Sequence, residues 1–135
     1  MTDTKIAVIG GSGIYDIDGL QDADWVTVET PWGAPSDQVL TGTLNGVAMV
    51  FLPRHGRGHV HTPTSVPYRA NIDALKRLGC TDVISVSACG SFREEMAPGD
   101  FVVVDQQVQV GVVVVLRIPI RRQQVTLVAV LRRSG

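Results

Sequence analysis

The stretch VPYRANIDALKRLGCTDVISVSACG, residues 66–90, decides the fold class, because its hydrophobic period changes near the middle. Up to Leu78, apolar residues recur at the spacing of one helix face and charged residues fill the other face. We therefore predict a helix over residues 66–78, capped at its start by Ser65 and ended by a left-handed Gly79. Its buried stripe is expected to consist of Tyr68, Ile72, Leu75 and Leu78.

Beyond the helix, the apolar run Asp82–Ser87 predicts a buried strand that closes on a loop at 88–91. Upstream, Asn45-Gly46 separates two apolar runs and predicts a tight hairpin. Further strands are expected at 5–9, 25–29, 38–44, 47–52 and 101–105. This order of elements predicts an α/β protein with a twisted mixed β-sheet flanked by helices, one of which is a clear crossover helix.

Groups that can bind an anion follow three of these strands. The loop Gly10–Gly13 offers main-chain amides and a hydroxyl, as an anion-binding nest does. An arginine and a histidine follow another strand, and a guanidinium fork matches the oxygens of a phosphate. Because open α/β sheets bind ligands at the carboxyl ends of their strands, we predict one phosphate site. Its residues are Ser12, Arg54, His55, Ser87 and Ala88.

Plainer interpretations of the same residues stay open. Arg54 could pair with a surface carboxylate, and His55 could simply be solvated. A dinucleotide site in an oxidoreductase is the competing interpretation of the first loop. That loop lacks the last glycine of G-x-G-x-x-G, because Asp16 stands in its place, and residues 14–24 show no helical stripe. We therefore reject a dinucleotide site.

Two further histidines raise the question of a metal. His59 and His61 would share one face of a strand, a spacing that suits a metal ion. No cysteine or carboxylate lies close to them in the sequence, so we expect a substrate-side loop and no metal site.

Composition indicates an ordinary globular chain of 135 residues, 44% apolar and 19% charged. We see no signal peptide and no apolar run long enough to span a membrane, so a cytoplasmic protein is expected. The two cysteines, Cys80 and Cys89, are expected to be buried thiols, although their spacing does not exclude a disulfide. No nucleic-acid partner is predicted, because the body is acidic and the basic end lacks aromatic residues.

The last thirty residues differ from the rest. All 13 acidic residues lie at or before Asp105, whereas residues 106–135 contain nine valines, five arginines and no acid. No hydrophobic period persists there, and Pro119 interrupts the middle. We therefore divide the chain into a domain part at 1–105 and an anomalous tail at 106–135. Our hypothesis is that the tail is out of its native reading frame, and the alternative is a genuine hydrophobic hairpin with a basic end.

Several longer motifs are specific enough to show a resemblance to a known protein family, which the single loops are not. They are IGGSGIYDI at 9–17, ETPWGAPSD at 29–37, RHGRGH at 54–59, YRANIDALKRLG at 68–79 and SACGSFREEMAPGDFVVVDQ at 87–106. Together they closely resemble the 5′-methylthioadenosine phosphorylase branch of the purine nucleoside phosphorylase family. The resemblance covers residue 5 to about 106, the N-terminal half of such enzymes, so the fold is expected to be nucleoside phosphorylase-like but incomplete.

The resemblance implies a pentosyltransferase that cleaves a purine nucleoside with inorganic phosphate as nucleophile. The expected reaction converts S-methyl-5′-thioadenosine and phosphate to adenine and 5-methylthioribose 1-phosphate. Phosphate is then a co-substrate and no cofactor is expected. The family's phosphate site falls on the five residues gathered above, and its catalytic acid lies in the second half.

The family further implies a homotrimer whose only other partners are the nucleoside and phosphate. A truncated chain that retains only phosphate binding, with weak or no activity, is the alternative function.

Overall fold

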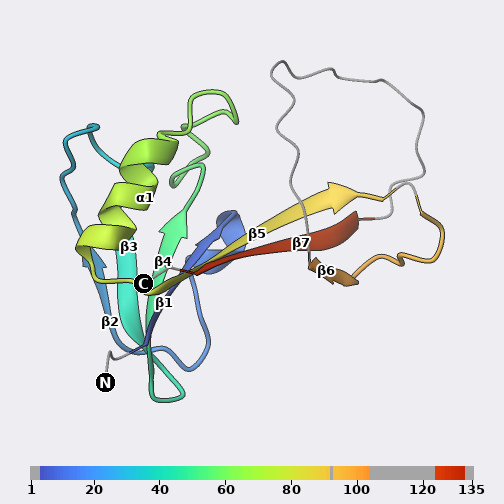
Figure 1. Ribbon diagram of the computed structural model, residues 1–135, viewed down its shortest axis with the longest axis horizontal. Coiled ribbons are helices and arrows are strands. Elements are labelled where there is room, and N and C mark those ends of the chain that lie inside the picture. Colours follow the sequence, from blue (N-terminus) through green and yellow to red (C-terminus); the bar gives the residue numbers. More distant parts are fainter. Residues whose placement is uncertain (1–3, 92, 104–123, 133–135) are drawn as a thin grey trace.

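The computed structural model describes residues 4–91, 93–103 and 124–132, whose strands form one mixed sheet in the order β2-β3-β4-β1-β5-β7-β6. Figure 1 shows helix α1 packed on the part of this sheet that contains β1, β3 and β4. The expected mixed α/β sheet is therefore confirmed. The elements are β1 Lys5–Gly10, the 3-10 turn η1 Ser12–Ile14, β2 Gln21–Val26, β3 Val39–Leu44, β4 Val47–Pro53, α1 Tyr68–Arg77, β5 Asp82–Gly90, β6 Phe101–Val103 and β7 Gln124–Arg132.

Strand β1 lies between β4 and β5 and runs parallel to both. Gly10 is paired with Pro53, and Ile9 is paired with Ser85. The carboxyl ends of β1 and β4 therefore coincide, and β5 continues past them. The hydrophobic core lies between helix α1 and strands β1, β3 and β4. Its buried side chains are Ala7, Val39, Val50, Leu52 and Leu75.

The hairpin between β3 and β4 forms as predicted. Asn45 has φ 49° and Gly46 has φ 80°, the two positive values that a type I′ turn requires. Strand β2 differs from the prediction of 25–29, because it spans Gln21–Val26. Its last residue pairs with Val39, the first residue of β3, so the chain beyond Val26 has no strand partner to continue on.

Helix α1 is shorter at both ends than the predicted 66–78. The expected cap was wrong: Pro67 occupies the N-cap position, and the Ser65 hydroxyl bonds to Thr62 instead. The predicted stop is confirmed, because Gly79 has φ +79°. The N–H groups of Gly79 and Cys80 donate to carbonyls of the last turn, which is the Schellman pattern of helix ends.

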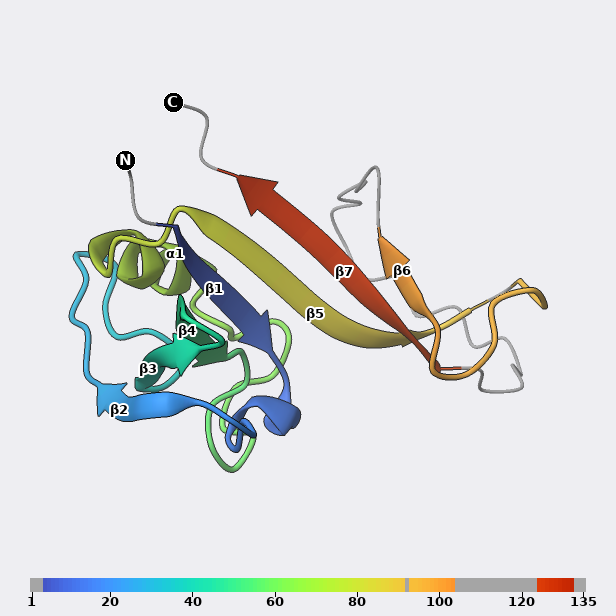
Figure 2. The ribbon, with the colours of Figure 1, turned by 90° about the horizontal axis from the view of Figure 1, so that it is seen from below.

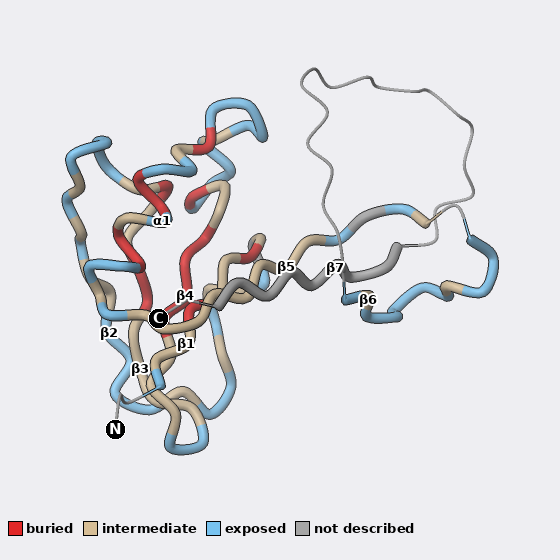
Figure 3. The backbone as a smooth tube through the Cα atoms, in the orientation of Figure 1, coloured by how far each residue is buried: buried red, intermediate tan, exposed pale blue. Residues whose placement is uncertain are grey.

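The buried face of α1 is only partly the predicted one: Leu75 is buried and Leu78 packs on the core, as expected. Tyr68 is 57% exposed and Ile72 is 46% exposed, so half of the expected apolar stripe points outward. The small side chains on the neighbouring face allow close approach to the sheet, which is why that face is buried (Figure 3). The buried residues of the helix are Ala70, Asn71, Ala74 and Leu75.

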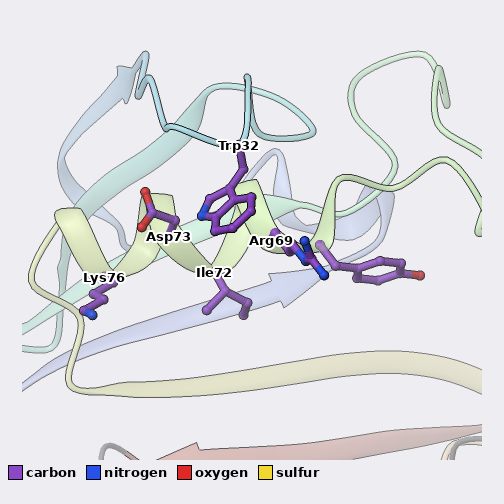
Figure 4. A pocket seen from close by; sticks show the side chains of 6 residues that line it. Trp32, Arg69, Ile72, Asp73 and Lys76 are labelled. Atoms are coloured by element: carbon purple, nitrogen blue, oxygen red, sulfur yellow. The ribbon is translucent and has the colours of Figure 1, made fainter.

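The outward face of α1 lines a shallow surface hollow together with Trp32 (Figure 4). The Arg69 guanidinium lies over the Trp32 ring at 5.1 Å from its centre. None of the five predicted phosphate residues lines this hollow.

Strand β5 is longer than predicted, because it continues to Gly90 by pairing with β7. Ala88, the predicted first residue of a loop, therefore lies on the strand, as Ser87 does. The far half of β5, with β6 and β7, extends away from the helix-covered core (Figures 1 and 2). Strand β6 is an edge strand of the sheet, and its Phe101 is 74% exposed.

The division at residue 105 falls outside the described residues, which end at 103 and resume at 124. The out-of-frame hypothesis for 106–135 therefore stays a prediction. Cys80 is a half-buried free thiol, so it forms no disulfide, and burial raises its pKa. No helix in the described ranges combines the length and apolar character needed to cross a membrane.

Candidate functional site

Arg54 connects the ends of two strands. It follows β4 directly, and its main-chain N–H donates to the Gly10 carbonyl at 2.8 Å, which ties it to the end of β1. Its side chain then reaches across to β5, where Nη1 donates to the Val86 carbonyl at 3.1 Å. The guanidinium is thereby held beside Ser87, the next residue of β5. The Arg54 side chain therefore lies against β5 next to Ser87, so the structure brings these two predicted residues close together.

His55 holds the Arg54 side chain in this position. Its Nδ1 lies 2.9 Å from the His61 carbonyl oxygen, which can only accept, so Nδ1 carries the proton. The other ring nitrogen, Nε2, then accepts a hydrogen bond from Arg54 Nε at 3.1 Å. Both described partners of the Arg54 side chain are uncharged in this arrangement, so neither neutralises the guanidinium. The positive charge of Arg54 is therefore not offset by either partner and remains to attract an anion.

This arrangement gives His55 a role that the sequence did not predict. With both ring nitrogens engaged, the ring orients the arginine. His59 stacks on His55 with a ring-centre distance of 5.7 Å and an interplanar angle of 9°. Direct phosphate binding by His55 stays a prediction.

Of the remaining predicted residues, Ser12 follows the end of β1, and Ser87 and Ala88 lie on β5 just past the point where its pairing with β1 ends. Ser12 opens η1, two residues beyond Gly10, and its side chain is outside the described part of the structure. The chain after η1 proceeds to β2 without an α-helix, so the helix that a dinucleotide loop needs is not formed there. Ala88 lies opposite Thr126 in the β5–β7 pair. Binding of phosphate by Ser12, Ser87 and Ala88 stays a prediction.

Sequence reasoning missed the residues that support this site. Asp37 and Arg57 form an ion pair with a 3.0 Å contact between Oδ1 and Nη2. The Arg57 guanidinium also lies over the Trp25 ring at 4.7 Å from its centre, and Trp25 contacts the Tyr15 ring. The two residues are twenty positions apart in loops, where no periodicity pairs them. RHGRGH and ETPWGAPSD each contain one member, which is the only signal that the sequence offered.

Hydrogen bonds to Asp37 change its acidity. Partial burial acts to raise the pKa of Asp37, but hydrogen bonds from the Arg57 side chain and from the main-chain N–H groups of Arg57 and Gln38 outweigh it. The pKa of this carboxyl therefore lies below its ordinary value. Burial and the nearby Asp37 carboxylate raise the pKa of the Tyr15 hydroxyl, partly countered by Arg57.

A dependence of stability on acid pH follows. Because the folded-state pKa of Asp37 is below its ordinary value of 3.8, its ionisation stabilises the fold above that pH. This stabilisation is lost as the pH falls through the lower folded-state value. Urea unfolding from pH 6 to pH 2 should show a steeper acid decline for the natural chain than for Asp37→Asn. Parallel curves would contradict a stabilising role of the ionised Asp37 carboxylate.

Metal ligands do not gather here: in the part of the chain that the structure describes, no three His, Cys, Asp or Glu residues form a group able to hold a metal ion.

The fold of this chain is that of a family of enzymes, the phosphorylases. The family model described as the phosphorylase superfamily matches residues 5–128. The chain belongs to the phosphorylase superfamily. The match continues past residue 105, where we divided the sequence.

Several curated relatives are named for one member of this superfamily. It is 80% identical over 103 residues to the S-methyl-5′-thioadenosine phosphorylase of Cereibacter sphaeroides, covering 76% of this chain and 36% of that protein. It is 63% identical over 101 residues to the protein of the same name from Geobacter sulfurreducens, covering 75% and 35%. The chain therefore spans about a third of the length of these relatives.

Solved structures agree with this similarity. A methylthioadenosine phosphorylase from an antarctic soil metagenomic library matches with a TM-score of 0.67 and 47% identity, over 76% of this chain and 36% of that chain. A mutant adenosine/methylthioadenosine phosphorylase from Schistosoma mansoni, in complex with adenine, matches with a TM-score of 0.66 and 44% identity, over 74% and 34%. The expected nucleoside phosphorylase-like fold is confirmed for the matched part.

Proposed function

We propose that this chain carries the phosphate-binding part of a nucleoside phosphorylase. The reaction is phosphorolysis of S-methyl-5′-thioadenosine to adenine and 5-methylthioribose 1-phosphate. The similarity to enzymes named for that substrate, at up to 80% identity among the relatives described above, supports the choice of nucleoside. Phosphate is a co-substrate, and the proposal includes no cofactor.

One observation carries the proposal. The Arg54 guanidinium spans from the end of β4 to the Val86 carbonyl of β5, over the point where β1 ends in its glycine loop. A fork-shaped cation at the point where two parallel strands end beside a third suits a small tetrahedral oxyanion. Hydroxyls of Ser12 and Ser87 and the Ala88 amide would complete the coordination of its oxygens.

The chemistry needs an anion held in this way. As the bond between the sugar carbon and the purine nitrogen breaks, its electron pair leaves with the purine, and positive charge develops on the sugar. A phosphate oxygen positioned beside that carbon stabilises the charge and then forms the new carbon–oxygen bond. The purine takes up a proton as it leaves. We assign that proton transfer to no residue of this chain.

The complete enzyme involves more than these residues. We propose residues 1–105 as the N-terminal part of the phosphorylase domain and 106–135 as a tail that is out of frame. We further propose a homotrimer in the cytoplasm, in keeping with the family and with the free thiol of Cys80. A chain that binds phosphate but turns over weakly or not at all is the second candidate. It is favoured by the coverage of about a third of each relative.

A phosphorolysis assay tests the proposal. The purified chain is incubated with S-methyl-5′-thioadenosine and inorganic phosphate, and adenine release is measured by chromatography. We expect little or no adenine, together with saturable phosphate binding. Adenine release that depends on phosphate would assign the full reaction to this chain. Absence of both turnover and phosphate binding would contradict both candidates, and saturable binding of NAD in their place would favour a dinucleotide site.

A further inference from the structure

We propose that Asp37 is a positioning residue for the phosphate site. Through Arg57 it sets the shape of the loop 54–61, which presents Arg54 at the strand ends. The inference rests on the proposed function, because it assigns to Asp37 an effect on phosphate binding without contact to phosphate.

The contacts between Asp37 and this loop are unusually many for a surface ion pair. One carboxylate oxygen accepts from the Arg57 main-chain N–H at 2.7 Å, and the guanidinium Nε lies within 3.3 Å of both oxygens. Nη2 of Arg57 donates to Oδ1 at 3.0 Å and to the side-chain oxygen of Gln38 at 2.7 Å. The main-chain bond matters most, because it fixes the peptide three residues after Arg54.

The segment that carries Asp37 is itself anchored in the core. Its neighbour Ser36 is buried, and Asn71 on α1 is 2% exposed. The Asn71 side chain accepts from the Ser36 main-chain N–H at 2.8 Å and donates to the Ser36 hydroxyl at 2.7 Å. Gly56 packs so closely on this segment that an added Cβ would lie 2.7 Å from the Ser36 carbonyl oxygen. Helix α1 therefore fixes Ser36, and the adjacent Asp37 fixes the loop.

The loop depends on these contacts at Arg57, whose main-chain N–H donates to Asp37 and not to any residue of the loop. Within the loop, the His59 N–H donates to the Gly56 carbonyl at 3.1 Å, and a second set of bonds joins its two ends. The His61 N–H donates to the His55 carbonyl at 3.0 Å, and the His55 ring bonds back to the His61 carbonyl. Arg57 lies between those two histidines and is held from outside by Asp37. Release of Arg57 should let the pair of histidines shift, and with them the ring nitrogen that orients Arg54.

Isothermal titration with inorganic phosphate tests the inference in the full chain. Asp37→Asn keeps the shape but loses the charge, and Arg57→Lys keeps the charge but loses the fork. We expect both variants to bind phosphate about tenfold more weakly, a smaller loss than the roughly hundredfold effect of a 1 Å misplacement. The matched control is Asp73→Asn, which removes an aspartate–arginine pair on α1 whose arginine is about as exposed as Arg57, and it should bind as the natural chain does.

A second measurement separates positioning from a general loss of stability. Nitrogen NMR of His55 reports which ring nitrogen carries the proton. We expect the Nδ1-protonated form in the natural chain and in Asp73→Asn, and a mixture of both forms in Asp37→Asn. Unchanged phosphate affinity with an unchanged His55 tautomer in folded Asp37→Asn would overturn the inference. If the natural chain binds no phosphate, the proposed function fails, and the tautomer alone decides whether Asp37 positions the loop.

Discussion

Replacing Gly56 by alanine is expected to lower the free energy of unfolding by about 2–5 kcal/mol, from backbone strain of about 1–2 and overpacking of about 1–3. Gly56 has φ +71°, a backbone conformation that side chains disfavour. Its added methyl group would also lie 2.7 Å from the Ser36 carbonyl oxygen and 2.9 Å from the Val60 side chain. Ser36 cannot retreat easily, because Asn71 holds it from the helix. Urea unfolding monitored by circular dichroism measures the difference.

Gly58 supplies the matched control within the same loop. It has φ +77°, and a Cβ added there would meet no atom within 4 Å. Gly58→Ala should therefore cost only the backbone strain, about 1–2 kcal/mol. If the two variants lose equal stability, the close approach of Gly56 to Ser36 is not a constraint on the loop.

The centre of the fold follows from local signals in the sequence. The strand at 5–9, the Asn45-Gly46 turn and the left-handed Gly79 depend on patterns of a few neighbouring residues, and each is confirmed. The approach of Arg54 to β5 beside Ser87 could also be predicted, because β1, β4 and β5 run parallel and the ends of β1 and β4 coincide. Phosphate binding at this place stays a prediction.

The face of α1 could not be predicted in the same way. Hydrophobic spacing favoured Tyr68 and Ile72 as buried residues, whereas the helix packs through two alanines and Asn71. Burial of Asn71 depends on its two hydrogen bonds to Ser36, a residue 35 positions away. A pattern of apolar residues contains no information about such a polar partner. The length of β5 was missed for a related reason, since its end is set by pairing with β7.

Replacing Arg54 by alanine is expected to weaken the binding of inorganic phosphate by roughly one to two orders of magnitude. This range corresponds to the loss of a hydrogen bond to a charged group, about 1.5–3 kcal/mol. The side chain bonds to the His55 ring and to the Val86 carbonyl, so alanine also removes the bridge from the end of β4 to β5. Isothermal titration with phosphate at pH 7 measures the loss.

Arg69 supplies the control, because its guanidinium is exposed on α1 and stacks on Trp32 instead of reaching the strand ends. Arg69→Ala removes the same net charge, so any loss it shares with Arg54→Ala reflects the general electrostatic field and not a site. Arg54→Lys separates the effect of charge from that of shape. The lysine ammonium keeps the positive charge, but it lacks the rigid fork that can bond to the Val86 carbonyl and to phosphate oxygens together. We expect an intermediate affinity for it. Equal affinities in Arg54→Ala and Arg69→Ala would mean that the strand ends do not bind phosphate through Arg54.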